Sequence, residues 1–472
     1  MGNTVISKNN TMVQNFEGWG TSLCWWANRI GYSQELTDLS ANLFFGKNGL
    51  ALNIMRYNIG GGDDPSHHHI TRTDSMIPGW LYYDKDTDTY QYDYTADKNQ
   101  LNVLRKCVEA SGEDAYVEVF SNSPPYFMTV SGCSSGGKNP GKNNLKDDCY
   151  TEFAEYLAHV TEYINNKLGI KVSSISPMNE PNTRYWSAFS EKQEGCHFDP
   201  GESQNRILIE TFNAIRKRGL ADIILAGSDE TSTAKQITAY NKYSPEVKSI
   251  IGRISTHTYD TRRIKQLGAL MKAEKRNFWM SETDWSNEAG KNAGDMRGGL
   301  WIAKKIISDI NGLSASAWVL WQVIDCHVSE EGYMGNKDSG MPDIRGGFWG
   351  LAVADHDKKE IVLSHKYYAM GQFSKYIRPG DSLIYCDSKT LAAYNEKTGK
   401  IVIVAINDTS KAKHRTFSLE GFSKTGNSAE IIRTSGSLES GEKWANIGSV
   451  DIVNNKLEVE LKSNSVTTLV IK

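Results

Sequence analysis

The sequence predicts a (β/α)8 TIM barrel of the α/β class, joined to a C-terminal antiparallel β-sandwich. Three observations favour this architecture. Short apolar runs alternate with amphipathic stretches eight times, strand-like runs such as residues 316–321 are apolar almost throughout, and only short strands and turns follow residues 378–380. Apolar runs of this kind are typical of parallel strands that are buried on both faces. We therefore expect the barrel at residues 15–378 and the sandwich at 379–472, with residues 1–14 as an N-terminal segment that could join the sandwich.

The individual elements follow from the periodicity of the apolar residues. The eight candidate barrel strands are residues 16–20, 51–57, 115–120, 172–177, 223–226, 253–256, 278–281 and 315–320. The clearest helices are residues 34–45, 148–168, 202–218 and 297–310, and a further helix at 364–376 follows the eighth strand. In the second helix Phe153, Tyr156 and Val160 recur at three- and four-residue steps, which predicts an apolar stripe facing a sheet. The sandwich strands are expected at residues 382–385, 390–395, 400–407, 415–419, 429–434, 456–461 and 466–471.

Composition limits the kinds of partner. A net charge of −3, from 53 Lys and Arg against 56 Asp and Glu, offers no field for capturing nucleic acid or an anionic membrane. The chain also lacks an apolar run of about 18 residues that could span a membrane. Its 12 Trp and 22 Tyr suit the C–H faces of sugar rings, although a barrel core will bury at least half of the tryptophans. We therefore expect a monomer that acts on a neutral, hydroxyl-rich polysaccharide or oligosaccharide.

Cysteine usage bears on the compartment. The seven cysteines lack the spacing of a metal site. Cys133 and Cys149 bracket a loop rich in Gly, Lys and Asn, which predicts a disulfide bond in an oxidising compartment. The N-terminus opens on polar residues rather than on a signal peptide. We expect a secreted protein, with a cytoplasmic location as the alternative.

Two glutamates stand where predicted strands give way to loops. Glu180, within Asn179-Glu180-Pro181, follows the fourth strand, and Glu282 ends the seventh. Because the C-terminal ends of barrel strands meet at one mouth, the two carboxylates should come together there. That mouth should also hold Arg56, Asn122, Asp229, His257 and Trp321. A carboxylate pair is what cleavage of a glycosidic bond requires, whereas the structural alternative makes Glu180 a helix cap and Glu282 a surface ion-pair partner.

Several short motifs occur in one order along the chain. They are Gly18-Trp-Gly20, Met55-Arg-Tyr-Asn-Ile-Gly-Gly61, Asn122-Ser-Pro-Pro-Tyr126, Ser176-Pro-Met-Asn-Glu-Pro181, His257-Thr-Tyr259 and Trp279-Met-Ser-Glu282. Together they resemble glycoside hydrolase family 30, which carries a C-terminal β-sandwich on its barrel. Residues 60–64 with the following three histidines, and residues 192–198, look most like the endo-β-1,6-galactanase branch of that family.

The resemblance implies roles for individual residues. Glu180 matches the acid/base of the family and Glu282 its nucleophile, Asn179 a residue that hydrogen-bonds the sugar 2-hydroxyl, and Tyr259 a residue that orients the nucleophile. Arg56 is placed to keep Glu282 ionised. Further substrate-binding candidates are Trp26, Asp63, Asn122, Tyr126, Trp186, His257, Trp285 and Trp321. Of these, Asp63 resembles a family position that binds a hydroxyl on the non-reducing side, with Asp64 as the neighbouring alternative, and His257 is expected to have a structural or hydrogen-bonding role.

Two metal-like patterns are interpreted as loops, so we predict no metal and no cofactor. Three consecutive histidines, residues 67–69, cannot easily face one ion, and spacing alone fixes no partner carboxylate nearby. Residues 84–95 begin like a calcium loop but have Thr89 and Thr95 where glycine and glutamate belong.

The leading functional prediction is a retaining, endo-acting hydrolase of β-1,6-linked galactan, the side chains of arabinogalactan. The alternatives are an exo-acting β-1,6-galactobiohydrolase and a β-1,6-glucanase or xylanase of the same family. A non-catalytic carbohydrate-binding barrel is the alternative from a different class. The paired glutamates argue against that last alternative, because two buried like charges are costly to keep.

Overall fold

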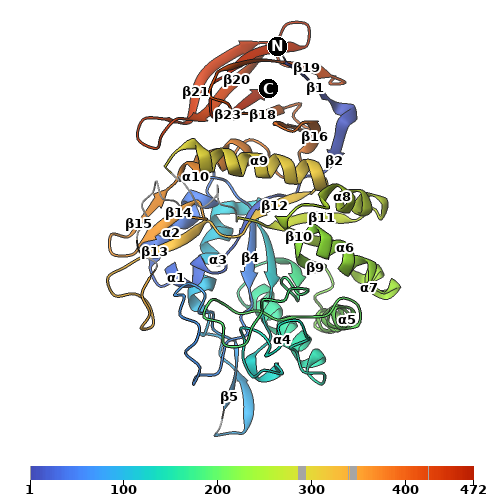
Figure 1. Ribbon diagram of the computed structural model, residues 1–472, viewed down its shortest axis with the longest axis vertical. Helices are drawn as coiled ribbons and strands as arrows, with labels where there is room; N and C mark the ends of the chain where they lie inside the picture. Colours follow the sequence, from blue (N-terminus) through green and yellow to red (C-terminus); the bar gives the residue numbers. More distant parts are fainter. Residues whose placement is uncertain (1, 85, 285–293, 339, 341–347, 424) are drawn as a thin grey trace.

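The computed structural model describes residues 2–84, 86–284, 294–338, 340, 348–423 and 425–472. Its centre is a closed barrel of eight parallel strands in the order β3-β4-β7-β8-β9-β10-β11-β12 (Figure 1). These strands are β3 (Gly18–Ser22), β4 (Ile54–Asn58), β7 (Tyr116–Phe120), β8 (Val172–Ser176), β9 (Ile224–Ser232), β10 (Arg253–Asp260), β11 (Asn277–Glu282) and β12 (Ala317–Leu320). Each overlaps one of the predicted strands, and the predicted fold class is confirmed.

Two barrel strands run further than their apolar runs. Strands β9 and β10 continue through Ser232 and Asp260, six and four residues beyond the predicted ends at 226 and 256. Their C-terminal parts carry Asp229 and His257, whose polarity interrupts the apolar pattern although both side chains are buried. The extended portions are the ones that line the mouth of the barrel.

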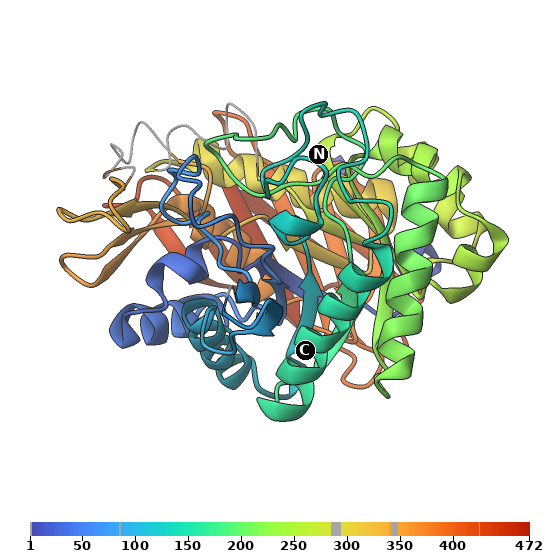
Figure 2. The ribbon, with the colours of Figure 1, turned by 90° about the horizontal axis from the view of Figure 1, so that it is seen from below.

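Ten α-helices surround the barrel or connect it to the sandwich in the described part of the chain. They are α1 (Trp26–Ile30), α2 (Gln34–Phe44), α3 (Lys98–Ser111), α4 (Tyr150–Glu162), α5 (Glu202–Lys217), α6 (Thr233–Asn241), α7 (Pro245–Ile250), α8 (Ile264–Ala273), α9 (Met296–Leu313) and α10 (His365–Ser374). Figures 1 and 2 both show α4 and α5 side by side on the outer surface of the barrel. The predicted helix at 148–168 is α4 followed by a π-helical turn over Tyr163–Lys167, and its apolar stripe is buried.

The C-terminal strands form two sheets. The seven-stranded sheet has the order β2-β16-β17-β18-β23-β20-β21, and the three-stranded sheet has the order β1-β19-β22. Their strands are β1 (Gly2–Ser7), β2 (Thr11–Val13), β16 (Ser382–Asp387), β17 (Thr390–Tyr394), β18 (Ile401–Asn407), β19 (Lys413–Glu420), β20 (Ser428–Ser435), β21 (Glu442–Asp451), β22 (Lys456–Leu461) and β23 (Ser465–Ile471). Ile6, Phe417 and Leu469 are among the apolar side chains buried between the sheets. The sequence did not predict β21, because it lies at the sheet edge and is largely exposed and polar.

Helices α9 and α10 lie between the seven-stranded sheet and the barrel (Figure 1). The N-terminal strand β1 pairs in parallel with β19, and β2 pairs with β16, so the first residues belong to the sandwich sheets. Two small sheets extend barrel loops: β5 (Leu81–Asp84) with β6 (Thr89–Tyr92), and β13 (Ile324–Val328) with β14 (Ala352–Asp355) and β15 (Glu360–Leu363).

The predicted disulfide is wrong. All seven cysteines lie in described segments, and all are free thiols. Cys133 is buried with its sulfur 3.3 Å from His69 Nε2, whereas Cys149 stands at the N-terminus of α4 with its sulfur beside Asp148. The two ends of the loop are therefore held by different parts of the fold.

None of the helices in the described residues is both long and apolar enough to cross a membrane.

Candidate active site

Glu180 lies in the loop that follows β8, with a left-handed backbone (φ 47°) that non-glycine residues rarely adopt. Its N–H donates to the carbonyl of Asp229 at 2.9 Å, which fixes this conformation. The side chain is 6% exposed; Oε1 lies 3.1 Å from Nδ1 of His257, and the Tyr185 hydroxyl donates to Oε2. The carboxylate is thus held at the mouth of the barrel by groups from three different loops or strands.

Glu282 is the last residue of β11 and is 4% exposed. The Tyr259 hydroxyl donates to its Oε1 at 3.0 Å, and Arg56 Nη1 donates to its Oε2 at 3.3 Å. His257 Nδ1 lies 3.3 Å from Oε1 and so stands between the two glutamates. One oxygen of Glu180 and one of Glu282 are within 4.8 Å of each other.

Arg56 is held by a buried ion network. Its guanidinium donates to Glu118 at 3.0 Å, to Asp229 and to Glu282, and it has no exposed surface. Asp229 in turn accepts from Ser281 Oγ at 2.5 Å and pairs with His257 Nε2 at 3.2 Å. Such a network positions Glu282 rigidly, because each buried charge has an opposite partner.

The glutamates face a cavity of about 580 Å³. Its aromatic wall includes Trp25, Tyr185, Trp186, Tyr259, Trp321 and Trp349. The rings of Trp25 and Trp321 meet edge to face at 5.0 Å, and the Arg72 guanidinium lies 4.5 Å from the centre of the Trp25 ring. Trp186 is fixed by a hydrogen bond from Nε1 to the Glu180 carbonyl and by Gly195, where a Cβ would lie 2.2 Å from the indole ring.

Comparison with protein families decides the assignment. The model of O-Glycosyl hydrolase family 30 matches residues 3–334. The chain belongs to glycosyl hydrolase family 30. The endo-beta-1,6-galactanase of Hypocrea rufa is 30% identical, with 96% of this chain and 91% of that protein covered. The exo-beta-1,6-galactobiohydrolase of Bifidobacterium longum is 26% identical over 83% of this chain and 31% of its own length.

Solved structures share the fold of this family 30 chain. A conserved exported protein from Bacteroides fragilis has a TM-score of 0.78 at 20% identity, covering 99% of both chains. A glycoside hydrolase family 30 subfamily 8 xylanase from Clostridium acetobutylicum has a TM-score of 0.71 at 19% identity, covering 100% of this chain and 99% of that one. At these identities the likeness concerns the barrel and its sandwich, not the substrate.

The pKa values in this family 30 site are strongly coupled through His257. Burial raises the pKa of Glu282 to about 7, with Glu180 adding to the rise and His257 and Arg56 opposing it. Burial also raises the pKa of Glu180, but hydrogen bonds from His257 and Tyr185 outweigh it, so the net direction is downward. Burial disfavours the imidazolium, yet Glu282 and Asp229 raise the pKa of His257 to about 10. In this arrangement the negative charge therefore favours Glu180. Because Glu180, His257 and Glu282 interact closely, the protons they bind are shared among the three side chains rather than fixed on one of them.

The structure brings together many of the predicted site residues. Glu180, Glu282, Asn179, Trp186, Tyr259 and Trp321 line the cavity. His257 and Arg56 are buried behind the two glutamates. The Oδ1 of Asn179 is buried, and no described residue hydrogen-bonds it.

Other predicted site residues do not line the cavity that the two glutamates face. Asp63 and Tyr126 line a second hollow of about 840 Å³, whose lining includes Glu194, the residue after Gln193 of the first cavity. Asn122 does not line either hollow; it is buried, with Nδ2 3.4 Å from Cys24 Sγ. Trp285 lies outside the described residues.

The placement of Trp26 corrects its predicted substrate contact. Its ring is fully buried against Phe44, and its Nε1 donates to the Ser22 carbonyl at 2.9 Å. The neighbouring Trp25 lines the cavity instead. Helix α1 begins at Trp26, which turns two adjacent indoles in different directions.

Sequence reasoning did not assign Tyr185 a role, although its hydroxyl contacts Glu180. The tyrosine adjoins Trp186 five residues beyond Glu180, and no sequence pattern distinguishes it from other loop aromatics. Replacing Tyr185 by phenylalanine should raise the pKa of Glu180, because the lost donor stabilised the charged carboxylate. A protonated Glu180 then persists to higher pH, and the alkaline limb of kcat/KM should move upward by up to about one pH unit.

The measurement is the pH profile of kcat/KM on a soluble oligosaccharide. Tyr385→Phe is the matched control, because Tyr385 is exposed to the same degree (48% against 49%) but lies on β16 of the sandwich. An unchanged or acid-shifted limb in Tyr185→Phe would show that this hydroxyl does not govern the acid.

Proposed function

We propose that this family 30 protein is a retaining hydrolase of β-1,6-linked galactan that cleaves internal bonds. The observation that carries the reaction type is the spacing of the glutamates, with one oxygen of each within 4.8 Å at the cavity floor. Retaining glycosidases hold their carboxyl groups about 5–5.5 Å apart, whereas inverting ones leave room for a water molecule at about 6.5–9.5 Å. The choice of substrate is supported by the 30% identity to an endo-beta-1,6-galactanase over nearly the whole chain.

In the first step Glu282 attacks the anomeric carbon and forms a glycosyl ester, while Glu180 gives its proton to the departing glycosidic oxygen. Arg56 and Tyr259 support the charged form of Glu282 by donating one hydrogen bond to each of its oxygens. In the second step Glu180 takes a proton from water, which cleaves the ester with net retention.

The reaction requires a protonated Glu180 at its start. Without substrate, however, the hydrogen bonds to Glu180 lower its pKa and so favour the charged carboxylate. Tyr185 and His257 supply those contacts, and Tyr185 lines the cavity together with Glu180. A leaving-group oxygen beside Glu180 takes the place of the Tyr185 hydroxyl. The pKa of Glu180 then rises. A proton shared among Glu180, His257 and Glu282 moves to Glu180, which must donate it to the leaving group.

Product analysis on a substrate panel tests the proposal. The panel consists of β-1,6-galactan, β-1,6-glucan, β-1,3-galactan and xylan, followed over time by chromatography. We expect a ladder of galacto-oligomers from β-1,6-galactan alone, with the β-anomer seen first by NMR. Galactobiose from the first minutes would make the enzyme exo-acting, and products from glucan or xylan would overturn the substrate. An α-anomer as first product would contradict the retaining mechanism.

A further inference from the structure

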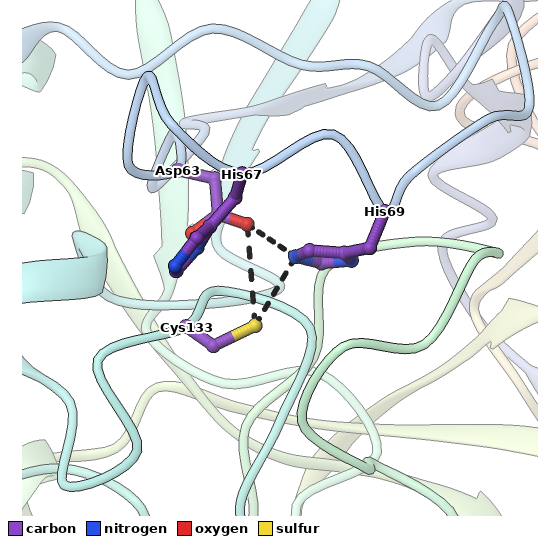
Figure 3. Close-up of side chains that lie close together, drawn as sticks. All are labelled: Asp63, His67, His69 and Cys133. Carbon is purple, nitrogen blue, oxygen red and sulfur yellow. Dashed lines mark hydrogen bonds and ion pairs between the residues drawn. The ribbon is translucent and has the colours of Figure 1, made fainter.

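Four side chains with metal-binding chemistry lie close together (Figure 3), and two of them, Asp63 and His67, line the second hollow. Asp63, His67 and His69 come from the loop between β4 and β5, and Cys133 comes from the loop between β7 and α4. One potential ligand atom from each lies within 4.8 Å of the others. His68, between the two histidines in the chain, is exposed and is not one of the four.

The hydrogen bonds of His69 fix the direction of its lone pair. Its Nδ1 lies 2.9 Å from the carbonyl oxygen of Ser190, which can only accept, so Nδ1 carries the proton. In the neutral ring Nε2 is then a bare acceptor. It points at Asp63 Oδ2, 2.6 Å away, and at Cys133 Sγ, 3.3 Å away. A histidine whose second nitrogen donates to a carbonyl is the usual form of a metal ligand.

The sulfur of Cys133 has one hydrogen-bond donor and several acceptors around it. It is buried and accepts the N–H of Phe189 at 3.3 Å. Its neighbour Ser135 Oγ, at 3.2 Å, has the Ser187 carbonyl as acceptor for its own proton. A carboxylate oxygen, an imidazole nitrogen and a thiol sulfur therefore meet at one point, where the Cys133 thiol donates to Asp63 Oδ2 at 3.9 Å. A cation that displaces the thiol proton would be bound by all three atoms at once.

We propose that Asp63, His69 and Cys133, with His67 as the fourth ligand, bind a zinc ion. Two neutral imidazoles, one carboxylate and one thiolate balance the +2 charge, and this N/O/S donor set suits tetrahedral Zn²⁺. On binding, a Zn–S bond forms and the thiol proton of Cys133 passes to solvent. The carboxylate that spacing alone could not supply to the histidines is Asp63, which the loop turns back toward them: His67 Nδ1 lies 3.1 Å from its Oδ1.

The ion would act on the walls of the cleft rather than on the reacting bond. Its ligands join the loops that follow β4 and β7, and the Ser190 and Phe189 contacts add the loop that follows β8. That third loop also carries Tyr185 and Trp186, which line the catalytic cavity. The bound ion would therefore have a structural role: it would fix the loops that follow β4, β7 and β8 relative to one another.

The test is zinc binding by the full chain without a histidine tag. After removal of metals and addition of Zn²⁺, we expect about one zinc per chain by mass spectrometry. Cobalt should give the absorption of tetrahedral thiolate coordination. Cys133→Ser should abolish that absorption, and His69→Gln should weaken Zn²⁺ binding at least about tenfold. Zn²⁺ should raise Tm of the wild type and not of Cys133→Ser.

His68→Gln and Cys149→Ser are the matched controls, since each removes the same chemical group outside the cluster, and both should bind zinc as the wild type does. The cobalt spectrum of the wild type tests the ligand set even if a variant fails to fold. Wild-type protein that binds no zinc at micromolar concentration would overturn the proposal and leave a protonated His69 paired with Asp63. Binding that His68→Gln loses and Cys133→Ser keeps would overturn it equally.

Discussion

Replacing Glu282 by glutamine should lower kcat by roughly four orders of magnitude or more, because an amide cannot form the glycosyl ester. The fold should survive, since glutamine has nearly the same shape, its amide oxygen can still accept from Arg56 Nη1, and the Tyr259 hydroxyl can turn to accept from its amide N–H. Turnover on β-1,6-galactan measures the loss. The mass of a trapped glycosyl-enzyme, present in the wild type and absent in the variant, identifies the residue.

The same substitution should make the stability of the protein less dependent on pH between about 4.5 and 7. In the folded state the pKa of Glu282 is raised to about 7, above the value of an exposed glutamate near 4.5, so the unfolded chain loses this proton first. Stability from this group is unaffected below about pH 4.5, falls as pH rises toward 7, and stays lowered above it. The Tm of Glu282→Gln minus the Tm of the wild type should therefore rise over that window. Glu246→Gln, at an exposed position on α7, should show neither effect.

Remaining turnover within about a hundredfold of the wild type would remove Glu282 from the role of nucleophile. A Tm difference between variant and wild type that does not change between about pH 4.5 and 7 would show that the carboxyl of Glu282 is not held at a raised pKa.

The barrel could be predicted because its signal is carried by the apolar residues themselves. Strands such as β12 are buried on both faces, so nearly every residue reports the same state. The positions of Glu180 and Glu282 follow from the same periodicity, because each marks where an apolar run meets the mouth. Conversely, β21 shows no such run, since it has an exposed edge.

The direction in which individual side chains point could not be predicted from the sequence. Trp25 and Trp26 are adjacent and alike, and only the start of α1 decides that one faces the cavity and the other Phe44. The conformation of the long loops could not be predicted from the sequence either. Cys133 and Cys149 bracket a loop whose length permits a disulfide, yet the loop turns Cys133 toward His69, which is 64 residues away in the chain. Contacts across loops depend on three-dimensional closure, which local patterns do not encode.

Replacing Glu180 by alanine should have an effect that depends on the leaving group. On β-1,6-galactan, where the departing sugar oxygen needs a proton, kcat/KM should fall by about two to four orders of magnitude. On an aryl galactoside with a good leaving group the first step needs no acid, so the glycosyl-enzyme still forms and then accumulates, because no base activates water. The pre-steady-state burst of the aryl alcohol measures this directly.

Azide then distinguishes a missing base from a damaged fold. A small anion can occupy the space left by the Glu180 side chain and attack the glycosyl-enzyme without base assistance, so azide should speed turnover of the aryl substrate and give a β-galactosyl azide. In Glu282→Gln azide should have no effect, because no glycosyl-enzyme exists to be attacked. An α-azide from Glu180→Ala would exchange the roles of the two glutamates. A variant that binds substrate normally yet gives neither burst nor azide product would exclude Glu180 as the acid/base and leave it as the buried partner of His257 and Tyr185.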